Sequence, residues 1–100
     1  MNIVAINENN SITLNLEGWL DTAAAPELGA EIDKIESAAA ITLDFDKVEY
    51  IASSGVRMVV SGYRKAKDLG AEYTVKNVSP EIMNIFKMTQ LDKKMNIQAK

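Results

Sequence analysis

Apolar and polar residues alternate along three short stretches of the chain, at residues 12–17, 41–45 and 72–76, and residues 2–7 carry a short apolar run that predicts a first strand. A two-residue period is typical of strands that bury one face. The clearest case is residues 12–17, where Ile12, Leu14 and Leu16 share one side. Residues 8–11 carry asparagine and serine, which favour tight turns. We therefore expect the first two strands to pair as an antiparallel hairpin.

The intervening segments have a helical period instead, and they predict helices over residues 23–38 and 55–69 and a short helix from Ser79. Asp21 or Thr22 can cap the first helix, and Gly70 suits a left-handed end of the second. Ser79-Pro80 is a typical helix start. Ile82 and Phe86 then fall on one helix face and are expected in the core, whereas Met88 falls off it. Residues 95–97 are either a last strand or the beginning of a tail.

The order of these elements predicts a single mixed α/β domain over residues 1–100, with parallel strands joined by helices. Strands that are covered on both faces are continuously apolar, whereas the strands at 12–17, 41–45 and 72–76 alternate. We therefore expect a two-layer fold, with a sheet of four to five strands and helices on one face only.

Two hydroxyls and a glycine, Ser53-Ser54-Gly55, stand where the second predicted helix begins. A serine at this place can cap the helix. The free backbone N–H groups there can equally hold a phosphate. If the strands at 12–17 and 41–45 are parallel, the loops 17–22 and 46–54 lie at one edge of the sheet, where sites tend to occur. Asp21, Asp46 and Glu49 would then surround the two serines.

Composition narrows the possible functions. The 100 residues contain no cysteine and no histidine, which excludes disulfides, thiolate zinc sites and a Ser-His-Asp triad. A net charge of −3 is unfavourable for nucleic-acid binding. No apolar run is long enough for a membrane span or a signal peptide, so we expect a cytoplasmic protein without membrane insertion. No phosphate-loop motif is present, and we expect no cofactor.

Several charged side chains are candidates for binding sites. Asp21, Asp44, Asp46 and Glu49 could form a magnesium site, but a solvated rim is favoured, because charged side chains are mostly exposed and Asp44 should point to the opposite face. A hydrolase that uses these carboxylates is a remote alternative. The basic side of the helix at 55–69 is either a solvated face or a docking face for an acidic partner. Trp19 either packs over a helix start or is exposed as a contact residue.

The chain resembles the STAS domain family of anti-sigma factor antagonists over nearly its whole length. Four segments carry the resemblance, in order: Gly18-x-Leu20-Asp21, residues 48–56 around Ser53-Ser54-Gly55, Val78-Ser79-Pro80-x-Ile82-x-x-x-Phe86, and Thr89-x-Leu91-Asp92-Lys93. Each motif alone is weak, but four at suitable spacing are fairly specific.

The resemblance implies a non-enzymatic, partner-switching protein. By position, Ser53 is the phosphorylated serine, and Asp21, Ser54, Gly55 and Arg57 belong to the partner-contact site. The implied partners are an anti-sigma factor with serine kinase activity, bound by the unphosphorylated form, and a phosphatase of the PP2C type. Ala52 stands where the family usually has an acid, and alanine cannot assist magnesium placement during phosphorylation. A second reading therefore stays open, namely an unphosphorylated STAS subunit of a lipid-transport complex or a scaffold.

Overall fold

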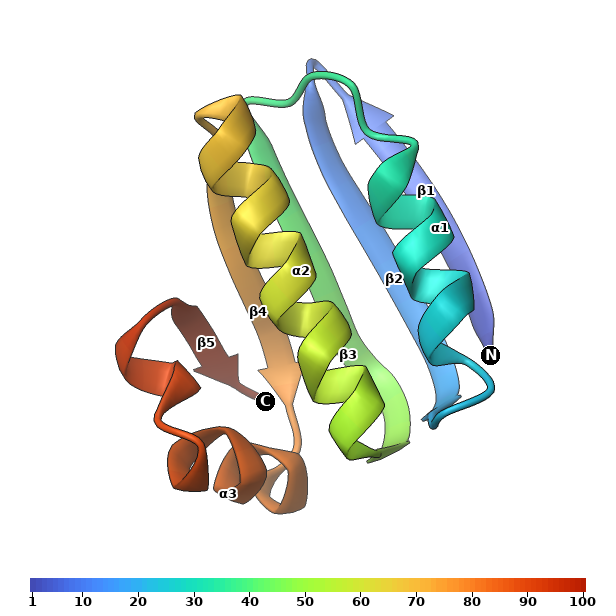
Figure 1. The fold of residues 1–100 in the computed structure, drawn as a ribbon, viewed down its shortest axis with the longest axis vertical. Coiled ribbons are helices and arrows are strands. Elements are labelled where there is room, and N and C mark those ends of the chain that lie inside the picture. The colour runs from blue at the N-terminus through green and yellow to red at the C-terminus, as the bar shows by residue number, and fades with distance from the viewer.

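The computed structural model describes residues 1–100 as a mixed five-stranded sheet with three α-helices (Figure 1). The elements are β1 (Asn2–Glu8), β2 (Ser11–Leu20), α1 (Ala25–Asp33), β3 (Ala40–Ile51), α2 (Ser53–Leu69), β4 (Glu72–Val78), α3 (Pro80–Met88), the 3₁₀ turn η1 (Leu91–Lys93) and β5 (Asn96–Ala99). The strands lie in the order β1-β2-β3-β4-β5. β1 and β2 are antiparallel, and the other neighbours are parallel. The predicted hairpin and parallel strands are confirmed.

One face of the sheet carries the core. Helices α1 and α2 lie side by side over this face, and α3 lies near the end of β4 (Figure 1). The buried strand residues are Leu14, Leu16 and Leu20 of β2, Ile41, Leu43, Phe45, Val48 and Ile51 of β3, and Tyr73, Val75 and Val78 of β4. Phe86 of α3 joins this core, with its ring centroid 6.0 Å from that of Phe45. On the other face, Thr13, Thr42 and Thr74 stand in register. The expected two-layer arrangement is confirmed.

Two close contacts fix the position of α2 on the sheet. A side chain at Gly62 would place its Cβ 2.6 Å from the Tyr73 hydroxyl, so glycine lets the helix approach β4. The Tyr73 hydroxyl donates to the Val59 carbonyl at 2.7 Å. The Tyr73 side chain is buried between helix and sheet, and its burial raises the pKa of the phenol above its ordinary value. The helix is therefore held at a short, defined distance from the strand below it.

Three predicted boundaries are wrong. The helix predicted over 23–38 ends at Asp33; the residues beyond it return to the sheet, and the Ala39 N–H donates to the Asn10 carbonyl at 2.8 Å. The predicted loops 17–22 and 46–54 are largely strand, because β2 runs to Leu20 and β3 to Ile51. Register shifts between residues 15 and 19 interrupt the alternation there, which hides these strand ends from a two-residue pattern.

Several local predictions are confirmed. Gly70 ends α2 in the left-handed conformation, with φ of 69°. The Ser79 side chain accepts from the Ile82 N–H at the start of α3. Residues 96–99 form the last strand, and Met88 is 83% exposed. None of the helices combines the length and the hydrophobicity that a membrane-spanning helix needs.

Candidate functional site

The ends of β2 and β3 meet at one edge of the sheet. The Ala52 N–H donates to the Leu20 carbonyl at 2.9 Å, so the chain leaving β3 is tied to the chain leaving β2. Asp21 directly follows the last residue of β2, and Ser53 directly follows Ala52. The Asp21 Oδ1 accepts from the Ala24 N–H at 2.9 Å, which caps the turn before α1. The expectation that these two connections lie close together is therefore confirmed.

The first turn of α2 has no side-chain cap. The N-cap residue is Ala52, which has extended backbone angles and offers no side-chain acceptor. Ser53 is the first helical residue rather than the cap, so the interpretation of this serine as a helix cap is wrong. Its side chain is exposed. A phosphate at this position would meet the positive end of the helix dipole and unpaired N–H groups.

The two neighbouring serines have different surroundings. The Ser54 hydroxyl donates to the Thr22 hydroxyl at 3.2 Å, which links the start of α2 to the segment before α1. Ser54 is also partly buried. Of the pair, Ser53 is therefore the hydroxyl that faces solvent without an assigned partner. Thr22 is a site residue that sequence reasoning treated only as a possible cap, and no pattern signals its contact with Ser54.

Gly55 allows α2 to start directly above β2. A Cβ at this position would lie 2.6 Å from the Leu20 carbonyl oxygen, 2.7 Å from the Leu20 Cγ and 2.9 Å from the Ile51 Cγ1. Contacts of this kind are ordinarily at least 3.4 Å. Only glycine fits without moving backbone. Gly55 therefore contributes to the site by placing Ser53 and Ser54 next to Asp21.

Arg57 lies one turn further along α2 and is exposed. It borders a groove of about 800 Å³ between α1 and α2, which also takes in Thr22 and Ser54. Arg64 and Lys65 continue the α2 wall of the groove, while small residues of α1, including Ala25 and Gly29, form the facing wall. The basic side of α2 thus borders a groove whose lining includes Thr22 and Ser54.

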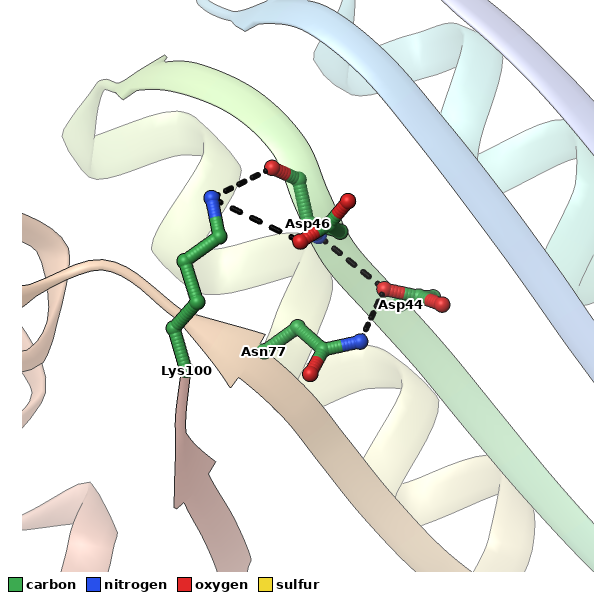
Figure 2. A network of polar contacts seen from close by, with 4 residues as sticks. All are labelled: Asp44, Asp46, Asn77 and Lys100. Atoms are coloured by element: carbon green, nitrogen blue, oxygen red, sulfur yellow. Dashed lines mark hydrogen bonds and ion pairs between the residues drawn. The ribbon is translucent and has the colours of Figure 1, made fainter.

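The expected acidic ring around the serines is only partly formed. Asp46 lies on β3 five residues before its end, roughly 16 Å from it at about 3.3 Å per residue. Its Oδ1 lies 3.5 Å from the Lys100 Nζ, which also donates to the Asp46 carbonyl at 2.7 Å. Figure 2 shows both contacts beside Asp44, whose Oδ1 accepts from Asn77 Nδ2 at 2.9 Å and from the Asp46 N–H at 3.0 Å. The placement of Asp46 at the serines is therefore wrong.

Glu49 contacts an exposed pair of aromatic residues, Trp19 and Tyr50, near the ends of β2 and β3. Its Oε2 accepts from Trp19 Nε1 at 3.3 Å. The rings of Trp19 and Tyr50 are 5.4 Å apart, and the two residues are 58% and 47% exposed. Trp19 is therefore an exposed residue rather than a cover for a helix. No group of three or more carboxylates in the structure could hold a metal ion.

Comparisons with known proteins agree with the fold described above. The family model of the STAS domain matches residues 2–100. The anti-sigma-B factor antagonist of Bacillus subtilis (strain 168) is 29% identical over 103 residues, covering 100% of this chain and 94% of that protein.

Three solved structures show the same fold. An anti-sigma factor antagonist from Mycobacterium paratuberculosis superposes with a TM-score of 0.88 at 21% identity, covering 99% of this chain and 86% of that one. SpoIIAA, the Bacillus cell fate determinant, matches in its unphosphorylated form with a TM-score of 0.78 at 18% identity, over 99% of this chain and 88% of that one. Its phosphorylated form matches with a TM-score of 0.77 at 21% identity, over 96% of this chain and 90% of that one.

Proposed function

Because this chain belongs to the STAS domain family, we propose that it is an anti-sigma factor antagonist whose binding is switched by phosphorylation of Ser53. The unphosphorylated form binds an anti-sigma factor with serine kinase activity, and the phosphorylated form releases it. The observation that carries this proposal is the exposed, non-capping Ser53 at the start of α2, beside Asp21. The similarity to an anti-sigma-B factor antagonist supports it.

The protein is the substrate of the switching reactions and supplies only the acceptor. The kinase transfers the γ-phosphoryl group of ATP to the Ser53 Oγ, which gives ADP and phosphoserine, and the hydroxyl proton passes to a base of the kinase. A phosphatase of the PP2C type then uses water to hydrolyse the ester, which returns the serine and releases inorganic phosphate. Ala52 cannot assist magnesium placement, so an acidic side chain of the kinase would have to do this.

Electrostatics explains how one phosphate can break a complex. Phosphorylation adds about −1.5 to −2 charges at neutral pH. Asp21, adjacent to Ser53 in this site, already carries a carboxylate, so a partner surface complementary to the unmodified site would meet excess negative charge. The side chain of Ser53 is exposed and caps nothing, so its modification leaves the core packing intact. The switch therefore acts on binding and not on folding.

The proposed contact surface consists of Asp21, Ser53, Ser54, Gly55 and Arg57. Each has a separate part: Ser53 receives the phosphate, Ser54 ties α2 to Thr22, and Gly55 sets the height of the helix start. Asp21 contributes a negative charge and Arg57 a positive charge to this surface. We further propose that the chain acts as one domain in the cytoplasm, where its partners act on transcription.

A pull-down from an extract of the native cells tests this function. The baits are the wild type, Ser53→Asp, and the control Ser37→Asp, which adds the same charge to an exposed serine after α1. Mass identification should find an ATPase-like serine kinase with the wild type and Ser37→Asp but not with Ser53→Asp. Equal capture of transport ATPase subunits by all three baits would instead support the constitutive-subunit alternative.

A further inference from the structure

We propose that Arg57 binds the phosphate of phosphorylated Ser53, so that the modified site is closed by an ion pair within α2. This inference rests on the proposed function, since it requires Ser53 to be the modified residue. It adds an intramolecular ligand for the phosphate, supplied by the residue that also contributes to the proposed partner contact.

The spacing of the two residues brings their side chains together. Arg57 follows Ser53 by four positions in a continuous helix. Residues at this spacing lie on the same face, about 5–6 Å apart between Cβ atoms. Helical side chains also lean toward the N-terminus, so the guanidinium of Arg57 extends back toward Ser53. A guanidinium at that distance can form two parallel hydrogen bonds to phosphate oxygens.

Arg57 is free to make this contact. It is exposed, and none of the four ion pairs in the structure involves it. Its position at the mouth of the α1–α2 groove leaves open space around the guanidinium. A phosphate on Ser53 would therefore gain a cation without breaking an existing salt bridge.

The same arrangement is less suited to Ser54. The residue four positions after Ser54 is Met58, which carries no charge. The Ser54 hydroxyl is also engaged with Thr22. The structure thus pairs a solvent-facing acceptor, Ser53, with a matched cation, and gives Ser54 a structural partner instead.

The ion pair has a regulatory consequence. Phosphorylation would add negative charge next to Asp21 and would also withdraw the Arg57 cation from the partner-contact surface. Both changes weaken binding to the same partner. The closed ion pair would in addition keep the phosphate close to the helix, so a phosphatase would have to displace Arg57 before hydrolysis.

Phosphorus NMR tests the ion pair without any partner protein. Phosphoserine is incorporated genetically at position 53 of the full chain, and the phosphate is titrated through its second ionisation, near pH 6. The variants are wild type, Arg57→Gln and the control Arg64→Gln. Arg64 lies on the same groove wall but roughly 10 Å further along the helix axis, about one Debye length away.

Replacing Arg57 should raise the phosphate pKa by about 0.3 to 0.7 units, the size of a surface ion pair. Replacing Arg64 should shift it by less than about 0.1 unit, because solvent and salt screen that charge. An unchanged phosphate pKa in Arg57→Gln, or an equal shift in both variants, would overturn the proposal. A different result would refute the proposed switch itself, namely that the phosphoserine protein binds the kinase as tightly as the unmodified protein does.

Discussion

Replacing Gly55 by alanine should destabilise the protein, although alanine is the better helix former. In a helix interior, glycine to alanine normally gains about 0.5–1 kcal/mol. Here the new Cβ would lie 2.6 Å from the Leu20 carbonyl oxygen and 2.9 Å from the Ile51 Cγ1, both in parts of the sheet that cannot move freely. Overpacking of this kind costs about 1–3 kcal/mol. Because the 2.6 Å contact is with a backbone oxygen, we expect a cost in the upper part of this range and a net loss of about 1–2 kcal/mol.

The assay is urea unfolding followed by circular dichroism, with thermal unfolding as a second readout. A loss of about 1–2 kcal/mol corresponds to a decrease in Tm of about 4–16 °C for a protein of this size. Gly29→Ala is the matched control, because its Cβ would meet only the flexible Met58 Sδ, at 3.1 Å. It should be neutral or stabilising by up to about 1 kcal/mol. If Gly55→Ala were as stable as Gly29→Ala, the close seating of α2 on β2 would be refuted.

Further predictions concern caps and buried groups. Ser79→Ala should cost about 1 kcal/mol, because its side chain caps α3. Ser53→Ala should change the free energy of unfolding by less than about 0.5 kcal/mol, since Ser53 is exposed and is not a cap; equal losses in urea unfolding would contradict the assigned N-caps. Tyr73→Phe should cost about 0.5–1.5 kcal/mol at pH 8 through the lost bond to Val59. Burial raises the pKa of Tyr73 in the folded state above the unfolded value near 10, so folding favours the neutral phenol. The stability that the neutral phenol contributes is full below about pH 10 and decreases above it. Above pH 10 the free energy of unfolding of the wild type should therefore fall by about 1.4 kcal/mol per pH unit relative to that of Tyr73→Phe. Parallel stability curves for the two proteins between pH 8 and 11 would show that the phenol is not buried.

Most strands and helices could be predicted because their signals are local. Alternation at 12–17, 41–45 and 72–76 and the caps at Ser79 and Gly70 each depend on a few adjacent residues. The single helix-covered face also followed from alternation alone. The ends of β2 and β3 could not be found this way, because register shifts break the two-residue period before Leu20 and Ile51.

The position of the candidate site could be predicted from the sequence, but its contacts could not. The serine pair and Asp21 were located from the order of strands and helices, which places the carboxyl ends of parallel strands together. The bond between Thr22 and Ser54 and the contact of Gly55 with Leu20 join residues more than thirty positions apart. Such contacts depend on tertiary packing, which no local pattern encodes. Asp46 was misplaced because β3 continues beyond it to Ile51, so that Asp46 lies within the strand and not in the loop before Ser53.

The most direct test of the switch is the affinity of the purified kinase partner for two forms of this protein. Isothermal titration would compare the unmodified chain with the chain that carries phosphoserine at position 53, both checked for identical circular dichroism. The account predicts binding by the unmodified form and an affinity at least about 100-fold weaker for the phosphoserine form, because like-charge contacts cost several kcal/mol. Equal affinities for the two folded forms would contradict the central claim that Ser53 controls partner binding.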